Sequence, residues 1–375
     1  MTPLFVIESG SVSGALLELS EKGTPKILFS QTEELPFSET VTEERLHLAT
    51  IAALKRVLEA MIKSDAFLQR RTDLENTQVI IGAPWYTSFS RVVSQTYKKP
   101  EVFKESTLDE MMTSELKRFE EENKLDESAP ILEKQATNIL LNGYSTTLPF
   151  GKKTLEVEVS FYISIITGSF KKEVEDVLAS HIVSEKVLWH SVPLVFFRAL
   201  KSLVSEKDFL ILEVGSELSE LSLVKNGHLL NTVSLPLGSR KILREISPKL
   251  GVSEQLIPSM FLGGDNESAE KLKAIKSDLL SEWQSVFHKA ISVISNSYII
   301  PQTIFLMTAD GIEPLVKNLL ADDTYVNEIV AGPSLLISTI MSLNPQTLVA
   351  QGSVSASSLV LVSSLFISSF EQTTN

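Results

Sequence analysis

The sequence contains no cysteine, which excludes disulfide bonds and thiolate metal sites. It also lacks an excess of basic residues, since 34 Lys and Arg stand against 47 Asp and Glu, for a formal charge of −13. Nucleic-acid binding requires a clustered basic face, so we expect no nucleic-acid partner. The first residues, MTPLFVIESG, have neither a basic segment nor a long apolar run. We therefore expect no secretory signal and a cytoplasmic protein.

Two common catalytic signatures are missing as well. No G-x-x-x-x-G-K-[ST] loop occurs, so a P-loop NTPase is unsupported. The five histidines are scattered and none has metal-ligand spacing. With 43 % hydrophobic and 22 % charged residues, the chain has the composition of an ordinary globular protein. Its length allows two or three domains, each with its own core.

Charge is absent from the whole segment between Ile329 and Phe370. Proline and glycine interrupt this segment, and its unbroken final part is too short to cross a hydrocarbon layer as a helix. Apolar residues there recur at the spacing of one helical face, at Leu359, Val362, Phe366 and Phe370. We expect a buried core helix, with a peripheral membrane contact as the alternative.

A tetrapeptide of the form Glu-x-Gly-Ser occurs twice, each time after an apolar run and before an alternating one. The first copy lies in PLFVIESGSVSGALLELS and the second in DFLILEVGSELSELSLV, which aligns Glu8 with Glu213. Each copy continues as a three-stranded β-meander followed by helix. A repeat of this kind indicates two related structural units.

Between the two units lies a segment without a counterpart in the second repeat. Its order of strands, charged amphipathic helix, further strands and final helix is typical of a compact α+β module. We therefore predict a first lobe at 1–76 and 184–207, an inserted α+β subdomain at 77–183, a second lobe at 208–240 and 299–375, and a helical subdomain of the second lobe at 241–298.

This organisation resembles the actin-like ATPase superfamily, in which two duplicated, ribonuclease-H-like lobes carry a nucleotide site. The inserted module is similar to that of the FtsA (cell division) and PilM (type IV pilus) families. The segment from ILEKQATNILLNGY into FLILEVGSELSELSLV is similar to FtsA in the order of its elements, and APWYTSFSRVVSQTYKKP is nearer to PilM. The resemblance covers nearly the whole chain. It implies an α/β, two-lobed fold with an inserted small α+β subdomain.

The resemblance also implies a site for ATP and Mg²⁺. In these families the first two hairpins grip the phosphates, since backbone N–H groups at tight turns form anion-binding concavities. By motif, the first phosphate loop contains Glu8, Gly10, Ser11 and Ser13, and the second contains Glu213, Gly215, Ser216 and Ser219. Glu8 and Glu213 take the metal-holding positions. Thr308 and Gly311 fall at the adenosine loop, which follows a late strand.

Several residues depart from the family pattern. The family acid is aspartate at both places, and glutamate moves the carboxylate by roughly 1.5 Å, away from the positions that octahedral Mg²⁺ at about 2.1 Å requires. Glu217 would add a repulsion of about 4 kcal/mol per unit charge at 4 Å and a dielectric of 20. Met307, Thr308 and Ala309 occupy the glycine positions of the adenosine loop. We expect weak or lost ATP binding and no catalytic residue.

The resemblance therefore implies a scaffold protein of the FtsA or PilM type rather than an enzyme. Its partner would be a tubulin-like division filament, or a cytoplasmic peptide of an inner-membrane pilus protein. The final residues, SSFEQTTN, form no basic amphipathic helix, so we expect membrane association at the inner face to be indirect. An active Mg-ATP-binding ATPase and a sugar-kinase-like enzyme stay open as alternatives, and a homo-oligomer stays open too.

Overall fold

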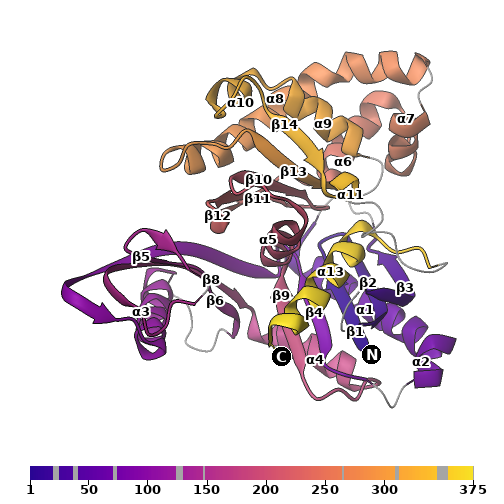
Figure 1. Cartoon of the computed structure of the whole chain (residues 1–375). Coiled ribbons are helices and arrows are strands. Elements are labelled where there is room, and N and C mark those ends of the chain that lie inside the picture. Colours follow the sequence, from indigo (N-terminus) through magenta and orange to yellow (C-terminus); the bar gives the residue numbers. More distant parts are fainter. Residues whose placement is uncertain are drawn as a thin grey trace.

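Two lobes and a projecting subdomain make up the molecule, and each is built on one sheet (Figure 1). The computed structural model describes residues 1–19, 25–36, 41–70, 74–123, 130–146, 148–263, 266–308, 312–343 and 354–374. The fold is mixed α/β, as the sequence predicts.

The first lobe contains a five-stranded sheet. Its strands are β1 (Thr2–Ile7), β2 (Ser11–Glu18), β3 (Lys26–Glu34), β4 (Thr77–Ile81) and β9 (Val187–Ser191). Their order is β3-β2-β1-β4-β9, with an antiparallel meander on one side and parallel strands on the other. The helices of this lobe are α1 (Glu43–Lys63), α2 (Asp65–Arg70), α4 (Gly168–Ala179) and α5 (Val192–Leu203).

The second lobe repeats this sheet strand for strand. Its strands are β10 (Phe209–Val214), β11 (Ser219–Lys225), β12 (His228–Leu235), β13 (Thr303–Thr308) and β14 (Leu336–Thr339). Their order, β12-β11-β10-β13-β14, matches that of the first lobe and confirms the predicted duplication. The helices are α6 (Ser239–Leu250), α7 (Ile257–Gly263), α8 (Asn266–Ser295), α9 (Glu313–Ala321), α10 (Thr324–Ile329) and α11 (Ile340–Leu343), with a 3₁₀ turn at Glu254–Leu256.

Local sequence explains why α1 forms where it does. The Thr42 hydroxyl accepts a hydrogen bond from the backbone N–H of Arg45, which caps the helix, and two acidic residues occupy the first turn. Apolar residues of α1 are buried against β2 and β3. A Cβ at Gly14 in β2 would lie 2.4 Å from Val57 Cγ1, so only glycine permits this close packing.

The projecting subdomain has its own four-stranded sheet and a small core. It consists of β5 (Tyr86–Val102), α3 (Glu105–Asn123), β6 (Ile131–Leu141), β7 (Tyr144–Ser145) and β8 (Lys153–Ile166), with strand order β5-β8-β6-β7. The subdomain therefore extends from Tyr86 to Ile166, which is shorter than the predicted range 77–183. β4 pairs with β1 in the first-lobe sheet, and α4 contacts α1. Both belong to the first lobe because their apolar residues face its core.

The uncharged C-terminal segment ends as helix α13 (Ser358–Thr374). It packs on α5, β1 and β2, so it lies against the first lobe although the sequence assigned 299–375 to the second. Leu359, Val362 and Phe366 are buried, which confirms the predicted core helix, while the side chain of Phe370 lies outside the described part. Within the described ranges, no helix has the length and apolar character to span a bilayer.

Replacing the most enclosed aromatic residue of α13 tests this packing. We expect Phe366→Ala to lower the free energy of unfolding by about 3–5 kcal/mol, because Phe366 is 1 % exposed and its removal leaves a cavity. Urea unfolding measures this change. Ile299→Ala is the control, since Ile299 is 69 % exposed and such changes usually cost less than about 0.5 kcal/mol. Equal losses in the two variants would contradict the packing of α13.

Candidate functional site

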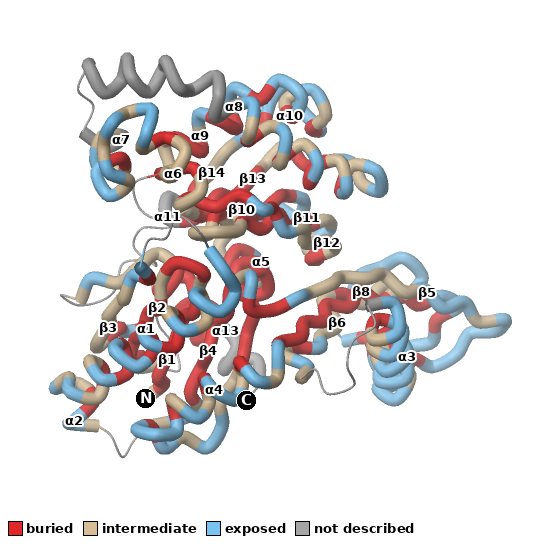
Figure 2. The backbone as a smooth tube through the Cα atoms, turned by 180° about the vertical axis from the view of Figure 1, so that it is seen from behind, coloured by how far each residue is buried: buried red, intermediate tan, exposed pale blue. Residues whose placement is uncertain are grey.

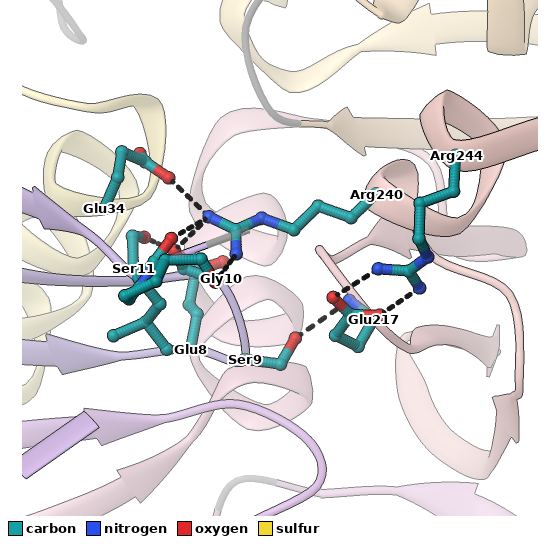
Figure 3. Close-up of polar contacts among 10 residues, drawn as sticks. Glu8, Ser9, Gly10, Ser11, Glu34, Glu217, Arg240 and Arg244 are labelled. Atoms are coloured by element: carbon teal, nitrogen blue, oxygen red, sulfur yellow. Dashed lines mark hydrogen bonds and ion pairs between the residues drawn. The ribbon is translucent and has the colours of Figure 1, made fainter. Parts of the chain in front are cut away.

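The turns of the two repeated hairpins meet between the lobes. Ser9 Oγ accepts a hydrogen bond from the backbone N–H of Glu217 at 3.0 Å (Figure 3). Gly10 approaches the opposite turn so closely that a Cβ there would lie 1.8 Å from Ser216 Oγ. Glycine is therefore required at position 10 for close approach, and not for a special backbone conformation. The two predicted phosphate loops are in direct contact.

Arg240, the second residue of α6, fastens the second lobe to the first. Its guanidinium donates hydrogen bonds to the carbonyl oxygens of Gly10 at 2.9 Å and Leu35 at 2.8 Å. It also lies 3.1 Å from the Glu34 carboxylate (Figure 3). Its side chain is only 12 % exposed. Hydrogen bonds from a charged donor contribute about 1.5–3 kcal/mol each, so Arg240 is a strong inter-lobe contact.

Glu217 does not place its charge where the sequence predicts. Its carboxylate accepts two hydrogen bonds from Arg244, at 3.1 and 2.6 Å, in the bidentate geometry that neutralises both groups (Figure 3). The sequence reasoning missed both arginines of α6. Their spacing of four residues at the start of a helix, in GSRKILRE, is a signal that could have revealed them.

A cleft of about 640 Å³ lies beside these turns. Six of the predicted site residues line it, namely Glu8, Ser11, Glu213, Gly215, Ser216 and Thr308. Ser11 and Ser216 share this cleft, as the duplication predicts. Its polar lining combines four carboxyl groups, at Glu8, Glu34, Glu213 and Glu254, with hydroxyl side chains and one amide. Arg240 is the one basic residue among the described residues that line it.

Two predicted phosphate ligands do not reach the cleft. Ser13 Oγ lies 2.8 Å from Thr32 Oγ1 across β2 and β3, and Ser219 Oγ donates a hydrogen bond to the carbonyl of Leu237. Both serines are buried, so their hydroxyls join strands and we do not retain them as ligands. Gly311, the last predicted residue, lies outside the described part of the chain.

The pKa values of the two repeated glutamates, Glu8 and Glu213, are raised. Removal from water raises the pKa of Glu8 to about 7, although the hydrogen bond from Ser11 opposes this and the charge of Glu34 adds to it. Burial, followed by the charges of Glu8 and Glu220, raises the pKa of Glu213 well above its usual range. Burial and these neighbouring charges therefore favour the neutral form of Glu213. A metal ligand must be deprotonated, so this state disfavours Mg²⁺ binding.

The residues present do not fit Mg-ATP in this arrangement. The turns that would surround the phosphates touch each other, and the donors of Arg240 are engaged by protein oxygens. Among the described residues, no group of three or more His, Asp or Glu is arranged to hold a metal ion. We derive no reaction step through a nucleotide.

A second cavity, of about 570 Å³, lies at the base of the projecting subdomain, and we name it the base groove. Pro84 and Trp85, just before β5, line it. Thr167, just before α4, and Ser169 and Phe170 in the first turn of α4 line it as well. α1 contributes Glu43, Leu46 and His47, and Val41 lies just before that helix. Glu217 and Leu218 enter from the second-lobe turn. The groove is therefore formed by both lobes.

One wall of the base groove is aromatic. The rings of Trp85 and Phe170 stack with centroids 4.2 Å apart, and His47 lies edge-on to both. His47 Nε2 is 2.6 Å from a Glu173 carboxylate oxygen. Trp85 is 8 % exposed, and its indole N–H has no hydrogen-bond partner among the described residues. This nitrogen has almost no exposed surface, so a ligand in the groove would contact the aromatic rings rather than the N–H.

Comparison with known proteins bears on the fold. No protein-family model matches the sequence, and no curated protein matches it. Among solved structures, the PilM-PilN type IV pilus biogenesis complex matches at 14 % identity over 97 % of this chain and 96 % of that chain, with a TM-score of 0.60. This chain has an actin-like, two-lobed fold of the PilM type.

Other solved structures match with TM-scores below 0.5. A Bacteroides thetaiotaomicron protein with an actin-like ATPase fold and unknown function matches at 12 % identity, over 92 % of this chain and 91 % of that chain, with a TM-score of 0.40. The activator of the 2-hydroxyisocaproyl-CoA dehydratase from Clostridium difficile, with bound ADPNP, matches at 11 % identity, over 100 % and 97 %, with a TM-score of 0.39. At these identities the likeness concerns the fold alone.

The acid pair of the cleft makes stability depend on pH. The pKa of Glu8 in the folded state is about 7, above its usual value of 4.5. The protonated Glu8 therefore stabilises the folded state fully below pH 4.5, and this stabilisation is lost as the pH rises through about 7. We expect the free energy of unfolding to fall between about pH 5 and pH 8, and to fall less in Glu8→Gln/Glu213→Gln. Urea unfolding across this range measures both slopes.

The exposed Glu185 provides the matched control for this pair. Glu185→Gln should keep the wild-type slope. If the double variant keeps that slope too, the two cleft carboxyls do not govern the pH dependence.

Proposed function

We propose that this chain is a protein-docking scaffold in which the base groove receives a segment of a partner. The observation that carries this proposal is the groove itself, with its wall of stacked Trp85 and Phe170. Its volume of about 570 Å³ falls within the usual range of ligand sites, about 300–1,000 Å³. Because both lobes line it, an occupant would contact both.

The lining indicates what kind of segment would fit. Leu46, Pro84 and Leu218 offer apolar contacts beside the aromatic wall. Glu43 offers a carboxylate to a basic flank. An extended peptide with an apolar residue next to Lys or Arg matches this chemistry.

The likeness to PilM supports a protein partner, because that structure is a PilM-PilN complex. By this analogy the partner is a cytoplasmic peptide of an inner-membrane pilus-type protein, and the scaffold lies at the inner face of the plasma membrane. A tubulin-like division filament, as in FtsA-like proteins, is the other candidate partner. Fold likeness carries function only as analogy, so the groove has to be tested directly.

A working ATPase is the second candidate, and one observation favours it. The cleft of about 640 Å³ lies between the repeated turns, where nucleotide binds in actin-like proteins. We nevertheless infer that Mg-ATP binding is weak or lost, because the two turns contact each other and the donors of Arg240 are engaged by protein oxygens.

Nucleotide titration separates these two functions. We expect no heat of binding, and no shift of the thermal unfolding midpoint, on addition of millimolar ATP with Mg²⁺, since the two turns contact each other and Arg240 is already engaged by protein oxygens. Calorimetry and thermal unfolding measure this. Binding at 100-fold excess over Kd would stabilise the protein by about 2.7 kcal/mol. A shift of several degrees would overturn the inference and favour the ATPase.

Peptide selection tests the base groove. From a displayed library of random dodecapeptides, we expect the chain to select apolar sequences flanked by Lys or Arg. Trp85→Phe keeps a stacking ring but makes the aromatic wall smaller, so it should weaken the best peptide about fivefold, the effect of about 1 kcal/mol of lost apolar contact. Fluorescence anisotropy measures the affinities.

Trp283→Phe is the matched control for this substitution. The indole N–H of Trp283 is also buried and unpartnered among the described residues, but Trp283 lies in the core of the second lobe. Its replacement should leave peptide affinity unchanged. Equal effects of the two substitutions, or selected peptides that bind Trp85→Phe as tightly as the wild type, would contradict docking at the groove.

A further inference from the structure

Large apolar side chains are exposed at the outer end of the projecting subdomain. We name this end the outer tip, comprising residues 97–104, 142–146 and 148–155. The exposed fractions are 79 % for Tyr144, 75 % for Leu148, 47 % for Leu155, 46 % for Phe150 and 39 % for Val102. These side chains come from separate stretches of sequence, yet the end of one sheet brings them together.

Pairing and hydrogen bonds hold the outer tip together. Val102 is in register with Lys153 in the β5–β8 pair, and the N–H of Phe103 donates to the carbonyl of Lys152 at 2.9 Å. Asn142 Oδ1 accepts hydrogen bonds from the N–H of Leu155 at 2.9 Å and from Glu156 at 3.2 Å. The exposed apolar side chains are thus carried by an ordered backbone, which lowers the entropy cost of docking.

The outer tip is basic in an otherwise acidic chain. It carries five exposed lysines, Lys98, Lys99, Lys104, Lys152 and Lys153. Glu101 is its one acidic residue, so its formal charge is 5 − 1 = +4 against −13 for the whole chain. Glu105 and Glu156 border it. The charge of this end is therefore opposite to that of the rest of the molecule.

The position of the tip separates it from the acidic lobes. The subdomain projects away from both lobes, and its outer end is largely exposed (Figures 1 and 2). At about 0.1 M salt, charges more than about 10 Å away are mostly screened. A surface that touches the tip therefore meets the lysines without strong repulsion from the lobes.

We propose that the outer tip docks on the surface of a lipid bilayer that contains anionic lipids. Lysines beside tyrosine, phenylalanine and leucine are the composition of protein surfaces that lie in the interfacial region of membranes. The lysines contact the anionic headgroups, and Tyr144 and Leu148 enter the interface. A projecting end fits a flat, deformable surface, whereas an acidic polypeptide is better held by a groove. This proposal does not depend on the base groove.

Sedimentation with vesicles tests this docking in the full chain. We expect binding to vesicles of phosphatidylcholine and phosphatidylglycerol in a ratio of about 7:3, little binding to phosphatidylcholine alone, and weaker binding as salt is raised. In Tyr144→Trp, the tryptophan emission should shift to the blue on adding the anionic vesicles, because the side chain leaves water.

Charge and apolar variants separate the two contributions. Lys98→Gln/Lys99→Gln should weaken partitioning about 30-fold, since each lysine near an anionic surface contributes about 1 kcal/mol. Lys172→Gln/Lys207→Gln, at exposed lysines elsewhere, should change it less than about twofold. Tyr144→Ser/Leu148→Ser should weaken it about tenfold or more. Val183→Ser/Ile299→Ser is the control for this apolar variant, because these two side chains are 89 % and 69 % exposed but lie outside the outer tip.

Three outcomes would overturn the proposal. The first is a wild-type chain that does not bind the anionic vesicles. The second is an equal loss of binding in the tip and control variants, with unchanged thermal unfolding midpoints in all of them. The third is wild-type binding to soluble polyglutamate, lost in the tip variants, without any binding to vesicles. That result would assign the tip to an acidic polypeptide instead.

Discussion

The contact between the two hairpin turns determines most of what the rest of the molecule can do. Gly10 has to lack a side chain because Ser216 occupies the space where its Cβ would lie. The same turn of the second lobe closes the central cleft with Ser216 and lines the base groove with Glu217 and Leu218. One point of contact between the lobes therefore sets the shape of both cavities.

The projecting subdomain is fixed to this junction at its base. The Tyr86 hydroxyl donates a 2.6 Å hydrogen bond to Glu220 of the second lobe, where burial raises the pKa of that carboxyl to about 7. On the other side, the N–H of Ser191 in the first lobe donates to Glu133 of the subdomain strand β6 at 3.1 Å. Buried hydrogen bonds of this kind fix orientation, because breaking one leaves an unpaired polar group. The subdomain is thus held at its base and exposed at its outer end.

The sequence predicts the frame of the fold better than the details of the site. Repetition of Glu-x-Gly-Ser between alternating runs revealed both lobes, because strand period and turn residues are local signals. The contacts of Arg240 and the stacking of Trp85 on Phe170 join residues far apart in sequence, so no local pattern encodes them. The position of β4 escaped prediction for the same reason. A strand that joins a neighbouring sheet has the same pattern as one that stays in an inserted module.

The two-lobed frame of this chain is closed by contacts within the protein. In a cleft that grips a nucleotide, the ligand supplies contacts that bridge the lobes. In this chain the protein supplies them itself, through Arg240 on the carbonyls of Gly10 and Leu35 and through Ser9 on Glu217. The lobes are therefore held together without a ligand. Because its two sides are already in place, the base groove is preorganised, and a docking segment would not have to pay for closing the lobes.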